Sequence, residues 1–261
     1  MRIFAVLAAC GLGLVFAQDA AGAEYVAIPA GRIASVLAND ADRTPAPVAA
    51  FSMRVMPVTN AEFHAFVSKN TQWRRGRAPA AFVDGSYLGH WASPLAPGGA
   101  ALPDQPVTAV SWFAAQAFCE SETARLPTWL EWEYVAAADA TRTDARSDEA
   151  WRAGILAWYA TPATAALQGV GGAANAYGVR DIHGLVWEWV DDFNALLVSP
   201  DSRNQGDPDK LQFCGAGAIS LQDRENYAVL MRIALLSSLS ATHSTSRLGF
   251  RCARPGVEDA K

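Results

Sequence analysis

The amino-acid sequence predicts a single α+β domain with short helices and strands and much irregular backbone. About half of its 261 residues are apolar (51%), which is enough for one sizeable core. Nine Trp, 20 Gly and 14 Pro indicate a chain rich in turns. No linker, shift in composition or internal repeat divides it, so we predict a leader at residues 1–23 and one domain at residues 24–261.

The N-terminus has the features of a cleaved export signal. Arg2 precedes the apolar run IFAVLAACGLGLVFA, and the small residues Ala-Gly-Ala at 21–23 follow at a typical cleavage position. We therefore expect a periplasmic protein whose mature chain begins at Glu24. Cys10 lies in LAAC, which resembles a lipobox. Because the apolar run before Cys10 is short and continues past it, a lipid anchor is the minor alternative.

Charge and hydropathy exclude two classes of partner. The formal net charge is -5, which argues against a nucleic-acid-binding surface. After the leader, no apolar run reaches the roughly 18 residues of a membrane span. The nearest run, AVLMRIALLSSL, is interrupted by Arg232. We expect neither nucleic acid nor a membrane span in the mature protein.

Strands are predicted near the N-terminus. Residues 24–37, EYVAIPAGRIASVL, are typical of a strand pair that breaks at Pro-Ala-Gly (29–31), and FSMRVMPV (51–58) is typical of another strand. Residues 73–101 are rich in Gly, Pro and Ala and predict a long ordered surface loop.

Helix-capping patterns predict the helices. Thr59 and Glu62 have the spacing of a capping box, as do Thr128 and Glu131, and an apolar stripe follows each pair. Two further helices are expected, one after Ser111 and one near residues 148–157.

The stretch NAYGVRDIHGLVWEWVDDF (175–193) combines bulky aromatic residues with four carboxylates. Its two Gly residues indicate tightly turned backbone. Such a segment buries aromatic faces while its carboxylates point at a specific group, and a cation is the expected one.

Five segments together carry a family resemblance. PVTNAEFHAFV, PVTAVSWFAAQAFCE, RLPTWLEWEYVAAA, NAYGVRDIHGLVWEWVDDF and SRLGFRCAR occur in this order across nearly the whole mature chain. They resemble the formylglycine-generating enzyme (sulfatase-modifying factor) family, and most closely its exported branch associated with copper-containing nitrite reductases. The resemblance implies a single α+β domain with little regular secondary structure, related to the C-type-lectin-like folds.

The resemblance also implies a structural calcium site. Asp181 and Glu188 would supply side-chain oxygens, and Gly184 and Val186 would supply carbonyls. Ca²⁺ takes about 6–8 oxygen ligands of these kinds. The alternative is that the two carboxylates form surface hydrogen bonds or ion pairs. Leu185 stands where the family often has Asn, and a second family site, upstream at 157–172, lacks the expected ligands and is not predicted.

Three cysteines remain after the leader, namely Cys119, Cys214 and Cys252. An odd number permits at most one intramolecular disulfide, and the spacing does not choose the pair. The family resemblance implies a bridge between Cys119 and Cys252, which leaves Cys214 as a free thiol.

The family's oxygen-dependent oxidase activity uses two cysteines that bind Cu(I). Their positions fall on about Ser220 or Asp223 and on Ala228, and no cysteine occurs between Gly215 and Arg251. Soft thiolates select Cu(I), so we predict that copper–thiolate chemistry is lost. Cys214 is one soft ligand nearby, which leaves a copper role doubtful.

A polar cluster stands near those positions, and it includes the candidate cleft residues Asp223, Arg224 and Tyr227. It is equally typical of a substrate site and of a salt-bridged surface turn. We hypothesise a binding or maturation factor for a periplasmic enzyme, with a copper-dependent nitrite-reductase type as the candidate. The alternative is an oxidoreductase of the same family that acts on a peptide or small molecule. A lectin-like ligand binder, suggested by fold analogy, ranks last.

Overall fold

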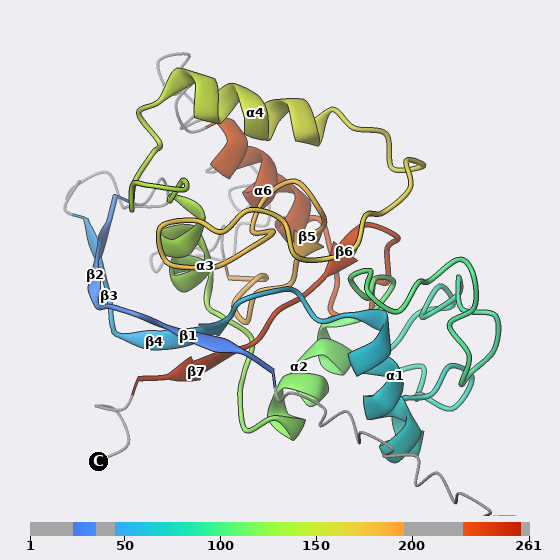
Figure 1. The fold of residues 1–261 in the computed structure, drawn as a ribbon. Helices are drawn as coiled ribbons and strands as arrows, with labels where there is room; N and C mark the ends of the chain where they lie inside the picture. The colour runs from blue at the N-terminus through green and yellow to red at the C-terminus, as the bar shows by residue number, and fades with distance from the viewer. Residues whose placement is uncertain (1–22, 35–44, 196–226, 257–261) are drawn as a thin grey trace, which may run out of the picture.

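The computed structural model describes residues 23–34, 45–195 and 227–256 (Figure 1). The predicted leader, Cys214, Asp223 and Arg224 lie outside these ranges. The helices are α1 (Asn60–Lys69), α2 (Trp112–Ser121), α3 (Trp129–Ala136), α4 (Glu149–Tyr159) and α6 (Tyr227–Ser237). The strands are β1 (Tyr25–Ile28), β2 (Gly31–Ile33), β3 (Ala46–Val48), β4 (Phe51–Arg54), β5 (Trp187–Glu188), β6 (Leu248–Gly249) and β7 (Ala253–Pro255). The α+β class with little regular secondary structure is confirmed.

The largest sheet joins the two ends of the chain. It is antiparallel with the order β1-β4-β7, so the N-terminal and C-terminal strands both pair with β4 (Figure 1). At its centre Met53 lies opposite both Val26 and Ala253. Strand β5, formed by Trp187 and Glu188, pairs in parallel with β6. The sheets therefore pair residues 248–255 with two distant parts of the chain, β4 and β5.

The predicted pairing of residues 24–37 with one another is wrong. Both strands form, but β1 pairs with β4 and β2 pairs with β3. Pro29 has no N–H group for a hairpin ladder, and the chain turns away at Gly31. A Cβ atom at Gly31 would lie 2.1 Å from the hydroxyl of Tyr134, so only glycine permits this close approach.

Both predicted capping boxes are present. The N–H of Glu62 donates to the hydroxyl of Thr59 at 3.3 Å, and the N–H of Thr59 donates to the Glu62 carboxylate at 2.8 Å. Thr128 and Glu131 form the same reciprocal pair at the start of α3. Ser111 caps α2 as predicted, and α4 follows Asp148 and ends two residues beyond the predicted 157.

Helix α6 was missed in the sequence analysis. Its buried residues recur at helical spacing, namely Ala228, Val229, Arg232, Ile233 and Leu236. Arg232 interrupts the apolar run, and that interruption obscured the stripe. A long apolar segment with one charge at a stripe position is a signature of a buried helix that carries an ion pair.

The core contains an aromatic cluster around Phe63. Its ring packs against Phe118 with centroids 5.8 Å apart and against Phe250 at 6.1 Å. The predicted loop at 73–101 contains no strand or helix beyond its first turn, yet it contributes the buried Trp91 to this cluster at 6.3 Å. This loop is thus partly core rather than only surface.

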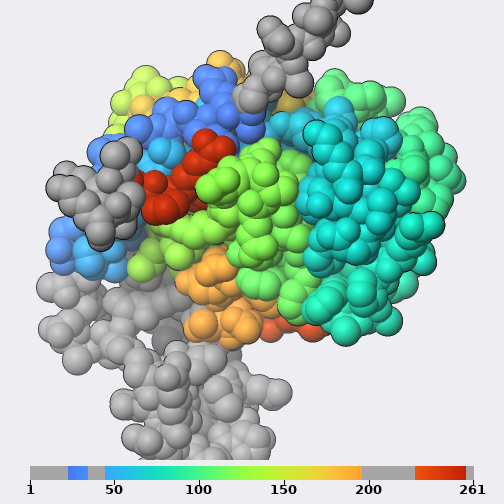
Figure 2. Space-filling model, turned by 90° about the horizontal axis from the view of Figure 1, so that it is seen from below, coloured from blue at the N-terminus to red at the C-terminus, as the bar shows by residue number. Residues whose placement is uncertain are grey.

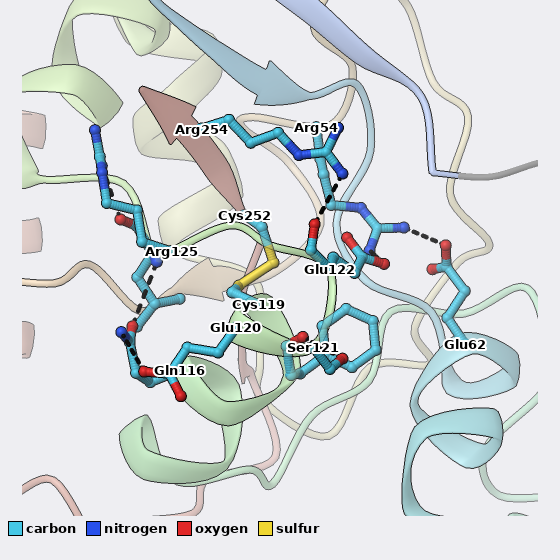
Figure 3. The surroundings of a disulfide bond; sticks show 12 residues. Arg54, Glu62, Gln116, Cys119, Glu120, Ser121, Glu122, Arg125, Cys252 and Arg254 are labelled. Atoms are coloured by element: carbon cyan, nitrogen blue, oxygen red, sulfur yellow. Dashed lines mark hydrogen bonds and ion pairs between the residues drawn. A yellow bond between two sulfur atoms is a disulfide. The ribbon is translucent and has the colours of Figure 1, made fainter. Parts of the chain in front are cut away.

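The disulfide between Cys119 and Cys252 is present and fully buried, and its two cysteines have a sequence separation of 133. Beside it, Arg54 forms ion pairs with Glu62 and Glu122 (Figure 3). Figure 2 shows the C-terminal strand in red between the blue N-terminal strands and the green region of α2. The disulfide covalently links α2 to the residue just before β7. No helix in the described part of the chain is long and apolar enough to cross a membrane.

Candidate functional site

Arg251 and Glu188 form an ion pair at the centre of the molecule, and both side chains are 0% exposed. Arg251 donates through Nε and Nη2 to the Glu188 carboxylate, at 2.8 Å in each case. Its remaining N–H groups reach the carbonyls of Arg54, Val55 and Arg180. A guanidinium has five N–H donors, so every donor has an oxygen acceptor. The charge is buried without an unsatisfied hydrogen-bonding group.

The two carboxylates predicted to bind calcium already accept hydrogen bonds from protein groups. Glu188 Oε2 also accepts from the indole of Trp132 at 2.8 Å, so three of the roughly four lone-pair sites of this carboxylate are taken. Asp181 accepts from the N–H groups of Gly171 and Gly172, one on each oxygen. Glu188 therefore retains room for one further contact and Asp181 for two, so each carboxylate could still bind calcium.

No group of three or more His, Cys, Asp or Glu side chains that could hold a metal occurs in the described ranges. The predicted set is of a different kind, because it combines two carboxylates with two carbonyls. Gly184 has φ +92°, a left-handed conformation that turns the backbone sharply at one of those carbonyls. The calcium site stays a prediction with a donor set of the appropriate chemistry.

A second buried ion pair joins α6 to α3. Arg232 donates through Nε and Nη2 to the two oxygens of Glu133, at 2.6 Å each, and through Nη1 to the hydroxyl of Tyr159. The guanidinium also lies over the ring of Trp132, 5.1 Å from its centroid. Burial acts to lower the pKa of Arg232, but the Glu133 carboxylate more than offsets it, so the pKa is raised. Arg232 stays charged and fixed.

A cleft opens beside this pair. It is narrow, with room for about one water molecule. Four tryptophans and Arg232 form much of its wall, together with aliphatic side chains and Glu188; the tryptophans are Trp129, Trp132, Trp158 and Trp187. The two ion pairs described above thus meet at one cleft, from opposite sides of Trp132.

The aromatic walls of the cleft are held by further contacts. Trp187 stacks on Tyr159 with centroids 4.5 Å apart, and Trp158 tilts against Trp187 at 5.3 Å. His183 packs edge-on between Trp132 and Trp151 and donates through Nε2 to the carbonyl of Ala136. Burial lowers the pKa of His183 to about 3, with Arg232 contributing, so the ring is neutral at pH 7. The cleft is preformed rather than loosely assembled.

Comparison with known proteins identifies the family. Residues 13–255 match the sulfatase-modifying factor enzyme 1-like domain, which is most of the chain. This protein belongs to the sulfatase-modifying factor family. It is 31% identical over 241 residues to the formylglycine-generating enzyme of Streptomyces coelicolor, covering 75% of each chain. It is 31% identical over 167 residues to hercynine oxygenase of Mycolicibacterium thermoresistibile, covering 55% of this chain and 36% of that one.

Among solved structures, PvdO from Pseudomonas aeruginosa is similar in fold. The identity is 17% and the TM-score is 0.48, with 89% of this chain and 94% of that one covered.

Of the three predicted cleft residues, Tyr227 alone lies in the described part of the chain. Tyr227 is the first residue of α6 and is 52% exposed, while Arg232 lies on the same helix and lines the cleft. Asp223, Arg224 and Cys214 lie outside the described residues, so their positions relative to the cleft stay predictions.

Sequence reasoning missed several of the residues that line the cleft. In the sequence Arg232 stands out only as a break in an apolar run, and Trp158 and Tyr159 lie just beyond the helix predicted near residues 148–157. One signal was available, because an Arg inside an apolar stripe requires a buried partner. That partner is Glu133, which is 99 residues away in the sequence. No sequence pattern identifies it.

Proposed function

We propose that this sulfatase-modifying factor homologue is exported to the periplasm and serves as a binding or maturation factor, rather than as a formylglycine-generating oxidase. Its client would be a periplasmic enzyme, with a copper-dependent enzyme of the nitrite-reductase type as the candidate class. One observation carries the proposal: no cysteine occurs between Gly215 and Arg251, where the family's catalytic pair is expected.

The chemistry supports this reading. Cu(I) is a soft cation that thiolates hold far better than oxygen ligands do. The second family position falls on Ala228, whose methyl group is buried on α6 and offers no donor atom. The tryptophan-lined cleft is nevertheless intact, and a binding role needs the cleft but not the thiolates.

The direct test is a copper and oxygen assay. The purified mature protein is incubated with Cu(I), oxygen and a cysteine-containing sulfatase peptide, with the Streptomyces coelicolor enzyme as the positive control. We expect no conversion of cysteine to formylglycine by mass spectrometry. Conversion at a rate near that of the control would refute the proposal.

The partner is tested by cross-linking in periplasm. A protein captured by the parent chain but not by a Trp187→Leu variant would support binding through the cleft, because Trp187 lines it. Equal capture by both forms would place any partner elsewhere, and repeated absence of a cross-linked species would count against a maturation factor.

A second candidate is an oxidoreductase of the same family that acts on a peptide or small molecule through a different site. The similarity to hercynine oxygenase and the polar groups of Arg232 and Tyr159 beside the cleft favour it. Joint substitution of Asp223, Arg224 and Tyr227 should then abolish turnover of any substrate found. Full retention of turnover would exclude that cluster as the active site.

Calcium belongs to the same proposal as a structural ion. Asp181 and Glu188 would each contribute one oxygen, and Gly184 and Val186 their carbonyls. The ion would brace the segment that leads into β5 and thereby position Trp187 in the cleft wall.

A further inference from the structure

The end of α1 and the long loop after it carry an excess of positive charge on an acidic protein. Residues 69–101 contain four basic residues and one acidic residue, Asp84, whereas the whole chain has a formal net charge of -5. The basic residues are Lys69, Arg74, Arg75 and Arg77. No ion pair in the described ranges includes any of these five residues. The positive charge of this region is therefore not balanced by a neighbouring carboxylate of the described chain.

Two of the arginines also fix the backbone around them. Arg74 donates to two carbonyls at the C-terminal end of α1, and Arg75 donates through Nη1 to three carbonyls of residues 88–91. These acceptors are neutral, so both guanidinium groups keep their full charge and further N–H donors. Arg77 is exposed, and its guanidinium donates to no residue that the structure describes.

An exposed aromatic group adjoins these charges. Phe82 is 41% exposed, and its ring lies 6.1 Å from the ring of Trp73 and 5.0 Å from the ring of Phe113. Trp73 directly precedes Arg74, and both Trp73 and Phe113 are only partly buried. We call these three aromatic residues and the three arginines the loop surface. Aromatic side chains and Arg are the residues enriched where proteins contact one another.

The loop keeps a defined shape although it contains little regular secondary structure. The hydroxyl of Tyr87 donates to the carbonyl of Trp73 at 2.8 Å, and the N–H of Leu88 donates to the carbonyl of Ala109 at 2.8 Å. Leu88 and Ala109 both have a positive φ, 48° and 53°, which few residues other than glycine adopt. Long ordered loops are often binding loops. A loop that is already ordered loses little conformational entropy when a partner binds.

The chemistry of the loop surface indicates an acidic partner of limited width. A carboxylate can form two parallel hydrogen bonds with a guanidinium, and Arg77 has no competing acceptor among the described residues. An apolar side chain beside that carboxylate would cover Phe82. A broad anionic surface, such as a membrane, would also face the rest of the chain, which holds 25 of the 26 acidic residues. A narrow acidic segment meets only the basic region.

We propose that the loop surface docks an acidic segment of a partner protein, in which carboxylates flank an apolar side chain. The inference rests on the proposed function, because a binding or maturation factor requires a partner, and it names the chemistry of that partner's contact face. The carboxylates would pair with Arg77 and with the remaining N–H groups of Arg74 and Arg75, and the apolar side chain would pack on Phe82.

Fluorescence anisotropy with a defined peptide measures this docking. The full mature chain is titrated into a labelled peptide of sequence Glu-Asp-Phe-Glu-Asp-Leu, and Gln-Asn-Phe-Gln-Asn-Leu serves as the uncharged probe. We expect the acidic peptide to bind more tightly than the uncharged one by about tenfold at low ionic strength. Its affinity should fall as salt is added, because salt screens interactions between exposed charges.

Two variants with matched controls locate the contact. Arg77→Glu should weaken binding of the acidic peptide by about threefold to tenfold, and Phe82→Ser by about threefold. Arg32→Glu makes the same change in net charge on β2, which lies on the opposite side of the molecule from the loop (Figure 1), and should leave the affinity nearly unchanged. Met231→Ser, at an exposed apolar residue of α6, is the control for Phe82→Ser.

Three results would overturn the inference: equal affinity for the two peptides or no binding of either, an equal loss of affinity in Arg32→Glu and Arg77→Glu, or binding that depends on Arg77 to phosphatidylglycerol vesicles but not to the acidic peptide. The last result would assign the loop surface to a membrane. Each leaves the loss of thiolate chemistry standing, because the copper assay measures it separately. Conversely, formylglycine formation in that assay would refute the proposed function without changing the peptide affinities.

Discussion

Arg251 links several buried parts of the chain through the hydrogen bonds of its guanidinium. Its guanidinium takes a positive charge into a site with no solvent exposure and joins Glu188 to three backbone carbonyls. A charge in such a place is tolerated because its donors all have acceptors. Removing it would leave Glu188 charged and without its principal partner.

Arg251→Met should therefore destabilise the protein by about 3–5 kcal/mol, the usual cost of breaking a buried ion pair from one side. Chemical denaturation monitored by tryptophan fluorescence measures the free energy of unfolding. The control is Arg142→Met, because the Arg142 guanidinium lies at the surface with Asp139 and Asp148. An equally small effect of both substitutions would contradict the central role of Arg251.

Burial disfavours the charged form of the Asp192 carboxylate. It accepts the N–H of Trp129 at 2.7 Å at the start of α3, and burial raises its pKa. Because the folded-state pKa lies above the unfolded one, the ionised form is disfavoured by folding. The charged Asp192 therefore lowers the stability of the wild-type protein at neutral pH. This loss of stability disappears as the pH falls through the folded-state pKa and the carboxyl group becomes protonated.

Asp192→Asn keeps an oxygen acceptor but removes the charge. We expect the variant to be more stable than the wild type at pH 7, with the difference shrinking as the pH approaches about 4, the unfolded carboxyl pKa. Unfolding curves across this range measure it. Asp192→Ala, which also loses the acceptor, is the comparison and should not gain stability. A difference that is constant with pH would disprove the assignment.

At the scale of elements, the caps determine where the short helices begin. Thr128→Ala removes the hydroxyl that accepts the N–H of Glu131 and should cost about 1 kcal/mol of stability. Thr164→Ala, at an exposed threonine, should change the midpoint of thermal unfolding very little. Equal shifts in the two variants would show that the capping box contributes nothing to stability.

The disulfide stabilises the junction of α2 with the residues just before β7. Joint replacement of Cys119 and Cys252 by alanine opens a loop of 133 residues and should lower stability by about 2–5 kcal/mol. The free energy of unfolding of the parent chain under oxidising conditions, compared with that of the variant, measures this loss, and the reduced parent should resemble the variant. If reduction does not destabilise the parent, the bridge contributes little.

Local patterns predicted these elements well, and distant pairings were not visible. Thr59 and Thr128 were placed as caps because a capping box lies within four residues of sequence. Strand β1 pairs with the strand that contains Phe51, and β2 pairs with the strand that contains Val48. No local sequence pattern identifies either partner strand. Helix α6 was missed because Arg232 appears polar in sequence, and only its partner Glu133 explains its burial.

At the scale of the molecule, the calcium proposal predicts a stability that depends on the ion. Free calcium at about 100 times its Kd should add about 2.7 kcal/mol to the free energy of unfolding, and a chelator should remove it. Asp181→Asn should abolish the response, whereas Asp139→Asn, at a carboxylate held by Arg142 elsewhere, should preserve it. An unchanged midpoint with calcium and with chelator would exclude a structural calcium.

The candidate site was only half predictable. The stretch 175–193 is predicted to form a calcium turn, and its aromatic and acidic residues include Trp187 and Glu188 of the cleft wall. One of its carboxylates, Glu188, pairs with Arg251, which is 63 residues away in sequence, and the calcium site stays a prediction. Such an internal cation has no local signature, since any arginine downstream is a candidate.

Residues 248–255 determine when the protein finishes folding. They supply β6, the internal guanidinium of Arg251, the second half of the disulfide and the strand β7 that completes the main sheet. A nascent chain that lacks them has an unpaired β4 edge, a buried carboxylate without its counter-charge and a single thiol. The main sheet, the internal ion pair and the disulfide are therefore all completed only once residues 248–255 are present.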